Sequence, residues 1–304
     1  MLRTLIQHCE EAKVFVLCLD EQCTRIVSSL RIRGVICISL SAFESEDLLV
    51  LKKERNIAEY CWTLSSCFPA WLMEKYPEID MLTYVDADLM FFSPLLPLFD
   101  EIGDSPIAII EHRFTPRLKH LESRGRFCVE WVSFRRNAEG LSCLRKWREQ
   151  CLDWCYDRLE DGRMGDQKYL DEWPAVYPGT HVLQHPGAGL APWNFPNYEI
   201  SESPSGQILV DGVSLVFYHF HQFQLLDDGS FYRLGSTYLQ ERNEPEAVYA
   251  AYEKALTEVA AEVRAVAPAF NAGLKSALQV NSRKWIQKYV PRRIKETLKR
   301  IIKY

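Results

Sequence analysis

The sequence lacks the patterns that would place it at once in several protein classes. No two of its ten cysteines have the Cys-x-x-Cys spacing, so the paired spacing typical of structural zinc sites is absent. No apolar run is long enough to span a bilayer, and the first eight residues are too short and too polar for a secretory signal peptide. There is also no internal repeat and no low-complexity segment. These absences leave a globular protein as the expectation.

The chain contains ample material for a hydrophobic core. It has 304 residues, 47% of them hydrophobic, with 14 Tyr, 15 Phe and 8 Trp. This is enough for one large domain with an appendage, or for two modest domains. The cysteines lie mainly in apolar stretches such as residues 16–19, which favours small buried side chains in a reducing cytosol over disulfides. We therefore expect a cytoplasmic protein.

Charge is distributed unevenly along the chain. The net charge is −5, but residues 283–304 carry nine Lys/Arg and one Glu, so this segment is +8 and the first 282 residues are −13. An acidic body argues against nucleic acid as a partner. In the basic segment, apolar residues at helical spacing face away from the basic ones: Ile294, Leu298, Ile301 and Ile302. This predicts binding to an anionic membrane surface, as a peripheral protein of the inner membrane. The alternative is a terminal helix packed on the domain.

Strand and helix patterns alternate along the chain. Short β-branched runs predict strands at 13–19, 34–39, 82–86, 106–111, 128–135 and 213–220. Helical spacing predicts helices at 1–11, 21–30, 45–76, 140–160 and from 244 onward. Residues 178–206 are rich in Pro, Gly, Asn and Ser and predict irregular loops near a site. The alternation predicts an α/β fold with a domain at 1–240 and a helical extension at 241–304.

Two carboxylates stand at the end of one predicted strand, in Leu82-Thr-Tyr-Val-Asp86-Ala-Asp88. Alternation along an extended chain places Asp86 and Asp88 on the same face. Apolar residues surround them, so their charges need a cation or hydrogen bonds as compensation. Mg²⁺ and Mn²⁺ prefer oxygen ligands and often bind substrate phosphates at the same time. The pattern favours a metal–diphosphate site over solvated turn acids or a helix cap.

A pair of histidines near the end of a late strand offers further ligands, in Phe217-Tyr-His219-Phe-His221. An imidazole is a suitable third ligand for Mn²⁺ or a similar ion. His219 and His221 share a strand face, so either could reach the metal. The alternative is that a strand-end histidine is simply satisfied by hydrogen bonds.

The order of these elements and motifs resembles a known family. A helix, a strand and a long helix precede Tyr84-Val-Asp-Ala-Asp88, and Ser93-Pro-Leu follows shortly after. This order is similar to that of metal-dependent glycosyltransferases of the A-type fold, most of all the retaining families related to glycosyltransferase family 8. The likeness covers roughly residues 1–225 and rests on four motifs: Asp86-Ala-Asp88, His219, Gly165-Asp-Gln167 and the stretch 127–135.

The resemblance implies a Rossmann-like mixed sheet flanked by helices, with a C-terminal helical appendage. It also implies transfer of a sugar from a nucleotide-diphosphate donor, such as a UDP-sugar, to a saccharide or lipid-linked saccharide, with retention of configuration. In such a site Asp86, Asp88 and His219 would hold Mn²⁺ or Mg²⁺ together with the donor diphosphate. The cation would spread the charge of the leaving nucleotide.

The resemblance gives Asp166 and Gln167 a role at the donor sugar, and the residue types of a later loop suggest an acceptor role for Trp193 and Asn194. Asp166 would bind sugar hydroxyls and Gln167 would lie near the anomeric carbon, although Asp166 is also a good helix N-cap. In the loop-rich stretch, Trp193 can stack on a sugar face and Asn194 can bind hydroxyls. Hydrophobic anchoring of the loop is an equally good interpretation of Trp193.

Two departures from the family pattern leave other functions open. The family usually has Asn-x-Gly where this chain has Cys128 and Glu130, and its first strand is expected before a helix that here already starts at residue 1. Either that strand is absent or the sequence lacks its natural start. A catalytically impaired sugar-nucleotide-binding scaffold at the membrane is therefore one alternative. Another is a sugar nucleotidyltransferase, although no glycine-rich triphosphate loop is present near residue 1.

Overall fold

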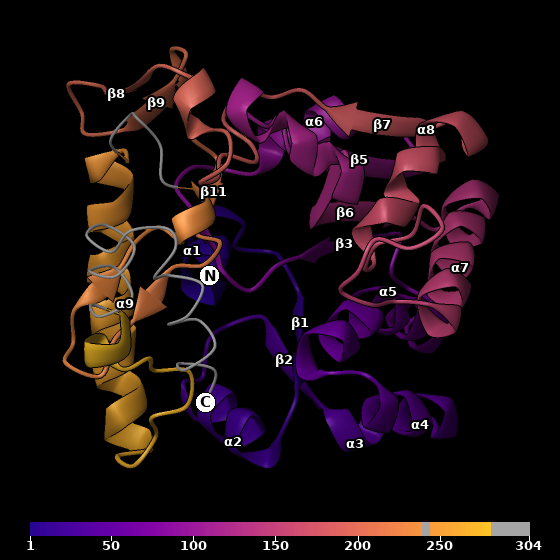
Figure 1. Ribbon diagram of the computed structural model, residues 1–304, viewed down its shortest axis with the longest axis horizontal. Helices are drawn as coiled ribbons and strands as arrows, with labels where there is room; N and C mark the ends of the chain where they lie inside the picture. The colour runs from indigo at the N-terminus through magenta and orange to yellow at the C-terminus, as the bar shows by residue number, and fades with distance from the viewer. Residues whose placement is uncertain (239–243, 281–304) are drawn as a thin grey trace, which may run out of the picture.

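The computed structural model describes residues 1–238 and 244–280, which form a mixed α/β fold (Figure 1). The largest sheet has the strand order β3-β6-β5-β7. Strands β3 (Met81–Val85) and β5 (Ile107–Glu111) are both antiparallel to β6 (Phe127–Arg135), and β7 (Thr180–Leu183) is parallel to β5. The predicted mixed sheet with flanking helices is confirmed, and so is a helical C-terminal part.

Strands β5 and β6 are buried on both faces, because helices cover the sheet on each side. Alternating residues of β5 point to opposite faces. Ile107 and Ile109 pack with side chains of α5 (Ile57–Lys75) and α7 (Ala138–Asp153). Ala108 and Ile110 instead pack with α6 (Leu96–Ile102). This layering explains why both strands are almost continuously apolar.

Helix α5 begins at a strong start signal. The Asn56 side chain accepts hydrogen bonds from the backbone N–H groups of Ala58 and Glu59, and the Glu59 carboxylate accepts one from the Asn56 N–H. This reciprocal capping box satisfies donors that the first helical turn leaves without a partner. It fixes the helix that carries Trp62, which lines the pocket of the candidate active site, and Ser65, which donates a hydrogen bond to Asp166.

The remaining strands form small sheets. Strands β1 (Val14–Cys18) and β2 (Val35–Ser39) are parallel, and β4 (Leu89–Phe91) is antiparallel to β11 (Phe217–His219). The others are β8 (Ile200–Glu202), β9 (Ile208–Val210), β10 (Val213–Ser214), β12 (Gln224–Leu225) and β13 (Phe231–Tyr232).

The remaining α-helices lie mainly around this framework. They are α1 (Leu2–His8), α2 (Glu21–Ser29), α3 (Leu40–Phe43), α4 (Glu46–Glu54), α8 (Trp173–Val176) and α9 (Glu246–Val266). Figure 1 shows the long α9 on one side of the molecule, with α7 and α8 on the opposite side. The 3₁₀ segments of the described residues are Pro116–Arg124, Gln167–Glu172, Phe195–Asn197 and Ser236–Tyr238.

An apolar pocket separates β1 from β3. Each strand has a single partner, β2 and β6 respectively, so each presents one edge that no described strand pairs with. Residues 13–17 and 81–85 both line this pocket, whose volume is about 570 Å³. Within residues 1–238 and 244–280 no strand lies between these two edges, so the sheet is interrupted between β1 and β3.

Several predicted boundaries differ from the structure. The helix expected over 45–76 is two helices, because the chain is extended at Arg55 and Asn56 caps a new helix. The helix expected over 140–160 ends at Asp153, and the strand expected over 213–220 is the separate β10 and β11. The sequence prediction also missed β4 and α6.

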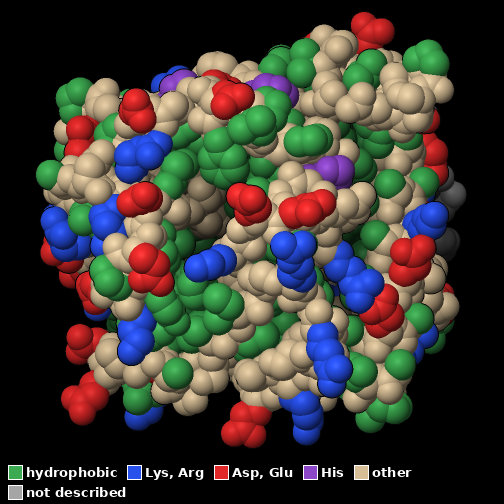
Figure 2. All heavy atoms as spheres, turned by 180° about the vertical axis from the view of Figure 1, so that it is seen from behind, with side chains coloured by type: hydrophobic (Ala, Val, Ile, Leu, Met, Phe, Trp, Pro, Cys, Tyr) green, Lys and Arg blue, Asp and Glu red, His purple; other side chains and the backbone are tan. Residues whose placement is uncertain are grey.

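The predicted membrane-binding segment, 283–304, lies outside the described residues. Among the residues that are described, no helix has both the length and the apolar character needed to cross a bilayer. Figure 2 shows one face of the molecule, on which acidic and basic side chains are interspersed rather than gathered by sign. All ten cysteines are free thiols, as the sequence predicts. The proposed domain boundary at residue 240 stays a prediction.

Candidate active site

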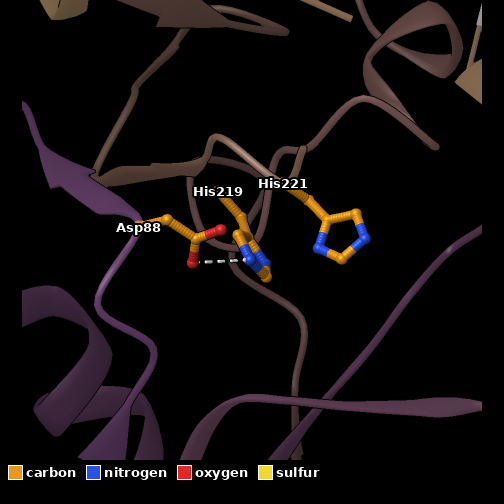
Figure 3. A group of neighbouring side chains, drawn as sticks. All are labelled: Asp88, His219 and His221. Atoms are coloured by element: carbon orange, nitrogen blue, oxygen red, sulfur yellow. Dashed lines mark ion pairs between the residues drawn. The ribbon is translucent and has the colours of Figure 1, made fainter. Parts of the chain in front are cut away.

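The pairing of β4 with β11 brings Asp88 next to His219. Leu89 lies opposite His219 in this short ladder, and the N–H of Phe220 donates to the carbonyl of Asp88 at 2.9 Å. As a result, Nε2 of His219 lies 3.0 Å from Oδ1 of Asp88. In Figure 3 the Asp88 carboxylate faces the His219 ring, with His221 beyond it. Two motifs about 130 residues apart in sequence thus meet, as predicted.

The charges of this pair depend on each other. Burial alone would lower the pKa of His219, but the charge and hydrogen bond of Asp88, joined by Glu130, raise it well above its usual value. Burial likewise raises the pKa of Asp88, yet the charge and hydrogen bond of His219 outweigh it and lower the pKa to about 2. Without a bound cation, a protonated His219 therefore balances the Asp88 carboxylate, and a metal ion at Nε2 would take the place of that proton.

Asp86 completes the predicted ligand set from the end of β3. Its Oδ2 lies 3.8 Å from Nε2 of His219, and its Oδ1 accepts a hydrogen bond from the Tyr84 hydroxyl at 2.9 Å. Burial raises the pKa of Asp86 to about 6, with the His219 charge opposing the rise. This carboxylate is costly to keep ionised without a further cation nearby.

The donor atoms are close enough to share one cation. Ligand atoms of Asp88, His219 and His221 all lie within 4.8 Å of one another. An ion bound at about 2.1 Å from each ligand needs those atoms about 3 to 4 Å apart, so small side-chain movements suffice. Burial, followed by the charge of His219, lowers the pKa of His221 to about 4, which leaves a neutral imidazole able to bind metal. A set of carboxylates and imidazoles at this spacing can hold a divalent cation.

A second, fully buried group shares His219. Cys128, Glu130 and His219 also place ligand atoms within 4.8 Å of one another. Oε2 of Glu130 accepts a hydrogen bond from Nδ1 of His219 at 2.6 Å. His219 belongs to both groups: its Nδ1 faces Glu130 and its Nε2 faces Asp88, and the group with Asp88 and His221 is the more exposed of the two.

Most of the residues predicted from the separate motifs line one pocket. It has a volume of about 380 Å³ and is lined by side chains that include Asp86, Asp166, Gln167, Trp193, His219 and His221. Asp88 and Asn194 do not line it. The fold therefore gathers the end of β3, the end of β11, the 3₁₀ turn at 167–172 and the 191–194 loop around a single cavity.

Asp166 is held inside this pocket by its neighbours. It is 6% exposed, and its Oδ2 accepts a hydrogen bond from the Ser65 hydroxyl at 2.6 Å. Asp166 does stand at the N-cap position of the turn Gln167–Glu172, but its side chain makes no capping hydrogen bond there. Burial raises the pKa of Asp166 to about 7, and the charge of Asp86 adds to the rise. Next to it, Nε2 of Gln167 donates to the carbonyl of Arg124 at 3.0 Å.

The 191–194 loop plays a more structural part than the predicted sugar contacts. Trp193 is 3% exposed and packs edge-on against His219 and His221, with ring centroids 5.1 and 5.6 Å apart. Asn194 is fully buried: its amide nitrogen donates to the carbonyls of His112 and Gly189, and its amide oxygen accepts from Ala191. With its amide committed inside the protein, Asn194 holds the loop and does not present hydroxyl-binding groups to the pocket.

Sequence reasoning missed several residues of the pocket. Trp62 and Tyr238 line it, and so does His112, for which the sequence offered no partner. His112 stacks on Phe114 at 4.6 Å, and burial lowers its pKa to about 3. These side chains come from α5, the 236–238 turn and the end of β5. These residues are far apart in sequence, so only the folded structure shows that they line one pocket. Tyr84, by contrast, could have been predicted from the sequence, because it shares a strand face with Asp86.

Comparisons with known proteins give distant relatives. No protein-family model matches the chain. It is 29% identical over 276 residues to the uncharacterized protein YfnD of Bacillus subtilis (strain 168), covering 90% of this chain and 88% of YfnD. It is also 29% identical over 280 residues to the uncharacterized protein YfnF of the same organism, covering 89% of this chain and 91% of YfnF.

Among solved structures the similarity is weak. The galactosyltransferase LgtC, in complex with donor and acceptor sugar analogs, has a TM-score of 0.45 and 14% identity, over 85% of this chain and 88% of that one. Mouse xyloside xylosyltransferase 1 has a TM-score of 0.42 and 14% identity, over 73% of this chain and 91% of that one. These are proteins to which the chain is similar, and the functional conclusion below depends on the residues of the pocket.

Proposed function

We propose that this protein is a metal-dependent glycosyltransferase. It would move a sugar from a nucleotide-diphosphate donor, with a UDP-sugar as the first candidate, to a saccharide or lipid-linked saccharide acceptor. The observation that carries the proposal is the meeting of Asp86, Asp88 and His219 beside one pocket that also holds Asp166 and Gln167. A cation–diphosphate site and a polar sugar site side by side are what this reaction needs.

The carboxylates and imidazoles would hold Mn²⁺ or Mg²⁺ against the donor. A bound divalent ion neutralises charge that develops on the leaving diphosphate. Asp88 and Asp86 supply the oxygen ligands, and His219 turns Nε2 toward both. Tyr84 holds the Asp86 carboxylate in place through its hydroxyl. Fixed ligands of this kind are stabilising because they need no rearrangement during the reaction.

Asp166 and Gln167 would hold the donor sugar. A carboxyl group with a pKa of about 7 exchanges its proton near neutral pH, so Asp166 can accept or donate a hydrogen bond to a sugar hydroxyl. The bond from Gln167 Nε2 to Arg124 fixes the amide and leaves its oxygen for the anomeric centre. Aromatic side chains such as Trp62 and Tyr238 add apolar walls for a pyranose ring. Retention of configuration belongs to this proposal through the family resemblance.

A donor panel tests the proposal. UDP-, GDP- and CMP-sugars are incubated with the protein and Mn²⁺, and hydrolysis or transfer to added saccharides is followed. We expect turnover of one nucleotide class, lost with chelator and in Asp86→Ala. Asp104→Asn is the matched control, since it removes an exposed carboxylate in the turn after α6 and should leave turnover unchanged. Turnover that survives Asp86→Ala contradicts the proposal.

Two observations favour a second candidate, a binding scaffold without turnover. The sheet is interrupted between β1 and β3, and a carboxylate stands at position 130, where the resembling family has glycine. A scaffold with an intact metal site would bind UDP with Mn²⁺ but would hydrolyse no donor in the same panel. A nucleotidyltransferase would instead consume a nucleoside triphosphate and a sugar phosphate.

A further inference from the structure

Glu130 is the most deeply buried carboxylate near the site. It lies on β6, one residue before Trp131, which pairs with Val85 at the end of β3. Its side chain has no exposed surface, and its Oε1 has no hydrogen-bond partner among the described residues. A buried carboxylate lowers the stability of the folded protein unless it is paired, so the burial of Glu130 depends on its hydrogen-bond partner. That partner is His219, through Oε2 and Nδ1 at 2.6 Å.

The two ring nitrogens of His219 face different carboxylates. Nδ1 donates to Glu130, while Nε2 lies 3.0 Å from Asp88 and 3.8 Å from Asp86. A ring flip or a rotation would break both arrangements at once. When one nitrogen of a histidine donates to a carboxylate, the other is left to bind a cation, and its basicity rises. We propose that Glu130 is a positioning residue, which rests on the metal site proposed above and holds His219 with Nε2 toward Asp86 and Asp88.

The neighbouring loop leaves room for Glu130. Gly189 has a φ of +70°, and a Cβ there would lie 2.9 Å from Oε1 of Glu130 and 2.8 Å from Nη2 of Arg113. A side chain at position 189 would therefore displace the Glu130 carboxylate. In the same loop, the carbonyl oxygen of Leu190 accepts a hydrogen bond from the backbone N–H of His219 at 2.7 Å. Carboxylate, histidine and loop form one connected unit.

Aromatic packing fixes the remaining freedom of the ring. Trp193 lies edge-on to His219 with an interplanar angle of 83°. Trp131, the residue after Glu130, stacks on Phe217 of β11 at 5.5 Å. The strand that carries Glu130 and the strand that carries His219 are thus held together by a second contact, and the hydrogen bond between the two side chains is set by the fold.

Three variants test the proposal. Glu130→Leu removes the acceptor, and Glu130→Gln keeps an amide oxygen that can accept from Nδ1. We expect Mn²⁺ affinity to fall about 10- to 100-fold in Glu130→Leu, the range typical of lost partners of metal-bound histidines, with a smaller fall in Glu130→Gln. Glu101→Gln is the matched control, because it weakens another carboxylate–histidine pair, Glu101 with His181 at 2.9 Å, outside the pocket.

A second readout needs no metal. In ¹⁵N-labelled protein the proton on His219 Nδ1 should be slow to exchange in the wild type and in Glu130→Gln, and should exchange fast in Glu130→Leu. Retained Mn²⁺ affinity in a folded Glu130→Leu protein, or a fast-exchanging Nδ1 proton in the wild type, overturns the positioning role. The two proposals can also fail separately. If the wild type binds no Mn²⁺, the proposed function is overturned. If its Nδ1 proton is nevertheless protected and exchanges fast in Glu130→Leu, the positioning role is supported.

Discussion

Asp166 illustrates how burial sets the chemistry of one side chain. The Ser65 hydroxyl donates to its carboxylate, and backbone N–H groups at positions 166 and 167 also favour the ionised form, but burial outweighs them. The ionised form is therefore poorly solvated, and burial is the main cause of a pKa of about 7. An acid with this pKa can donate or accept a hydrogen bond at a sugar site near neutral pH. It lowers the stability of the folded protein, however, whenever it is ionised there.

This linkage predicts a pH dependence of stability. In the unfolded chain Asp166 releases its proton near its ordinary pKa of 3.8, and in the folded protein near 7. Between these values the folded state holds the additional proton, so the free energy of unfolding falls as pH rises from about 4 to about 7. Asp166→Asn should flatten this part of the profile and be more stable than the wild type at pH 8, measured by urea unfolding across pH. Parallel profiles for the two proteins would contradict the burial account.

The buried hydrogen bonds of Asn194 predict that replacing this residue lowers the stability of the protein rather than its affinity for a sugar. Asn194→Ala leaves two buried carbonyls and one buried N–H without partners. We expect the free energy of unfolding to fall by about 2 to 4 kcal/mol, from about 1–3 kcal/mol for each unsatisfied group after partial relaxation. Urea unfolding measures it. Asn197→Ala is the control, because that amide makes an exposed bond to the carbonyl of Arg113 and should cost under about 1 kcal/mol. Equal losses in the two variants would argue against the assignment.

The sequence could predict those residues whose signal is local. Asp86 and Asp88 lie two apart on one strand, so a short stretch contains the whole pattern. The structural role of Asn194 could not be predicted, because its partner His112 lies 82 residues away. The burial of Glu130 likewise depends on a histidine 89 residues further along the chain. Contacts between distant segments decide these roles, and no local pattern encodes them.

At the scale of elements, the break between α4 and α5 shows a tertiary interaction overriding a helical pattern. Arg55, 5% exposed, donates to the carbonyls of Cys151 and Leu152 at the end of α7. These bonds hold the chain extended at Arg55, and the capping box of Asn56 restarts the helix. Periodicity alone predicted one long helix, because the partners of Arg55 lie 96 and 97 residues away. Strand β4 was missed because it has only three residues and its partner is β11.

The cap of α5 predicts a measurable contribution to stability. Asn56→Ala removes the acceptor of two backbone N–H groups and should lower the free energy of unfolding by about 1 to 2 kcal/mol. Ser45→Ala, at the cap of α4, is the matched control. Its single bond to the N–H of Leu48 is 3.5 Å long, so a smaller loss is expected. Chemical unfolding of both variants measures the two losses of stability. An Asn56→Ala protein as stable as the wild type would contradict the capping role.

At the scale of the whole molecule, the sequence predicted the class of the fold and the meeting of its acidic and histidine motifs. Strand-and-helix alternation was sufficient for the α/β class, because periodicity reports which faces are buried, whereas the mixed sheet was implied by the family resemblance. The interruption between β1 and β3 is a property of the assembled sheets, and only the arrangement of the two edges reveals it. The basic segment 283–304 remains a sequence prediction.

That segment predicts salt-sensitive membrane binding. Replacing Arg292, Arg293 and Lys295 together by Gln in the full chain should reduce partitioning onto vesicles containing phosphatidylserine. The reduction should reach up to about 100-fold, at about 1 kcal/mol for each charge near the surface. Vesicle sedimentation at low and high salt measures it.

The control for that experiment removes three basic residues from the acidic body: Lys53, Arg145 and Lys146. All three are exposed, so the net charge changes equally in both variants. If the two proteins lose vesicle binding to the same extent, net charge explains the binding and the amphipathic segment does not.

The central claim is that Asp86, Asp88 and His219 form a cation-dependent site for a nucleotide diphosphate. Calorimetric titration of UDP into the protein, with and without Mn²⁺, tests it most directly. We predict binding that requires Mn²⁺, is at least about 10-fold weaker in Asp86→Ala, equivalent to about 1.4 kcal/mol, and is unchanged in Asp104→Asn. UDP binding of equal strength with and without Mn²⁺, or equal in the wild type and Asp86→Ala, would contradict the claim.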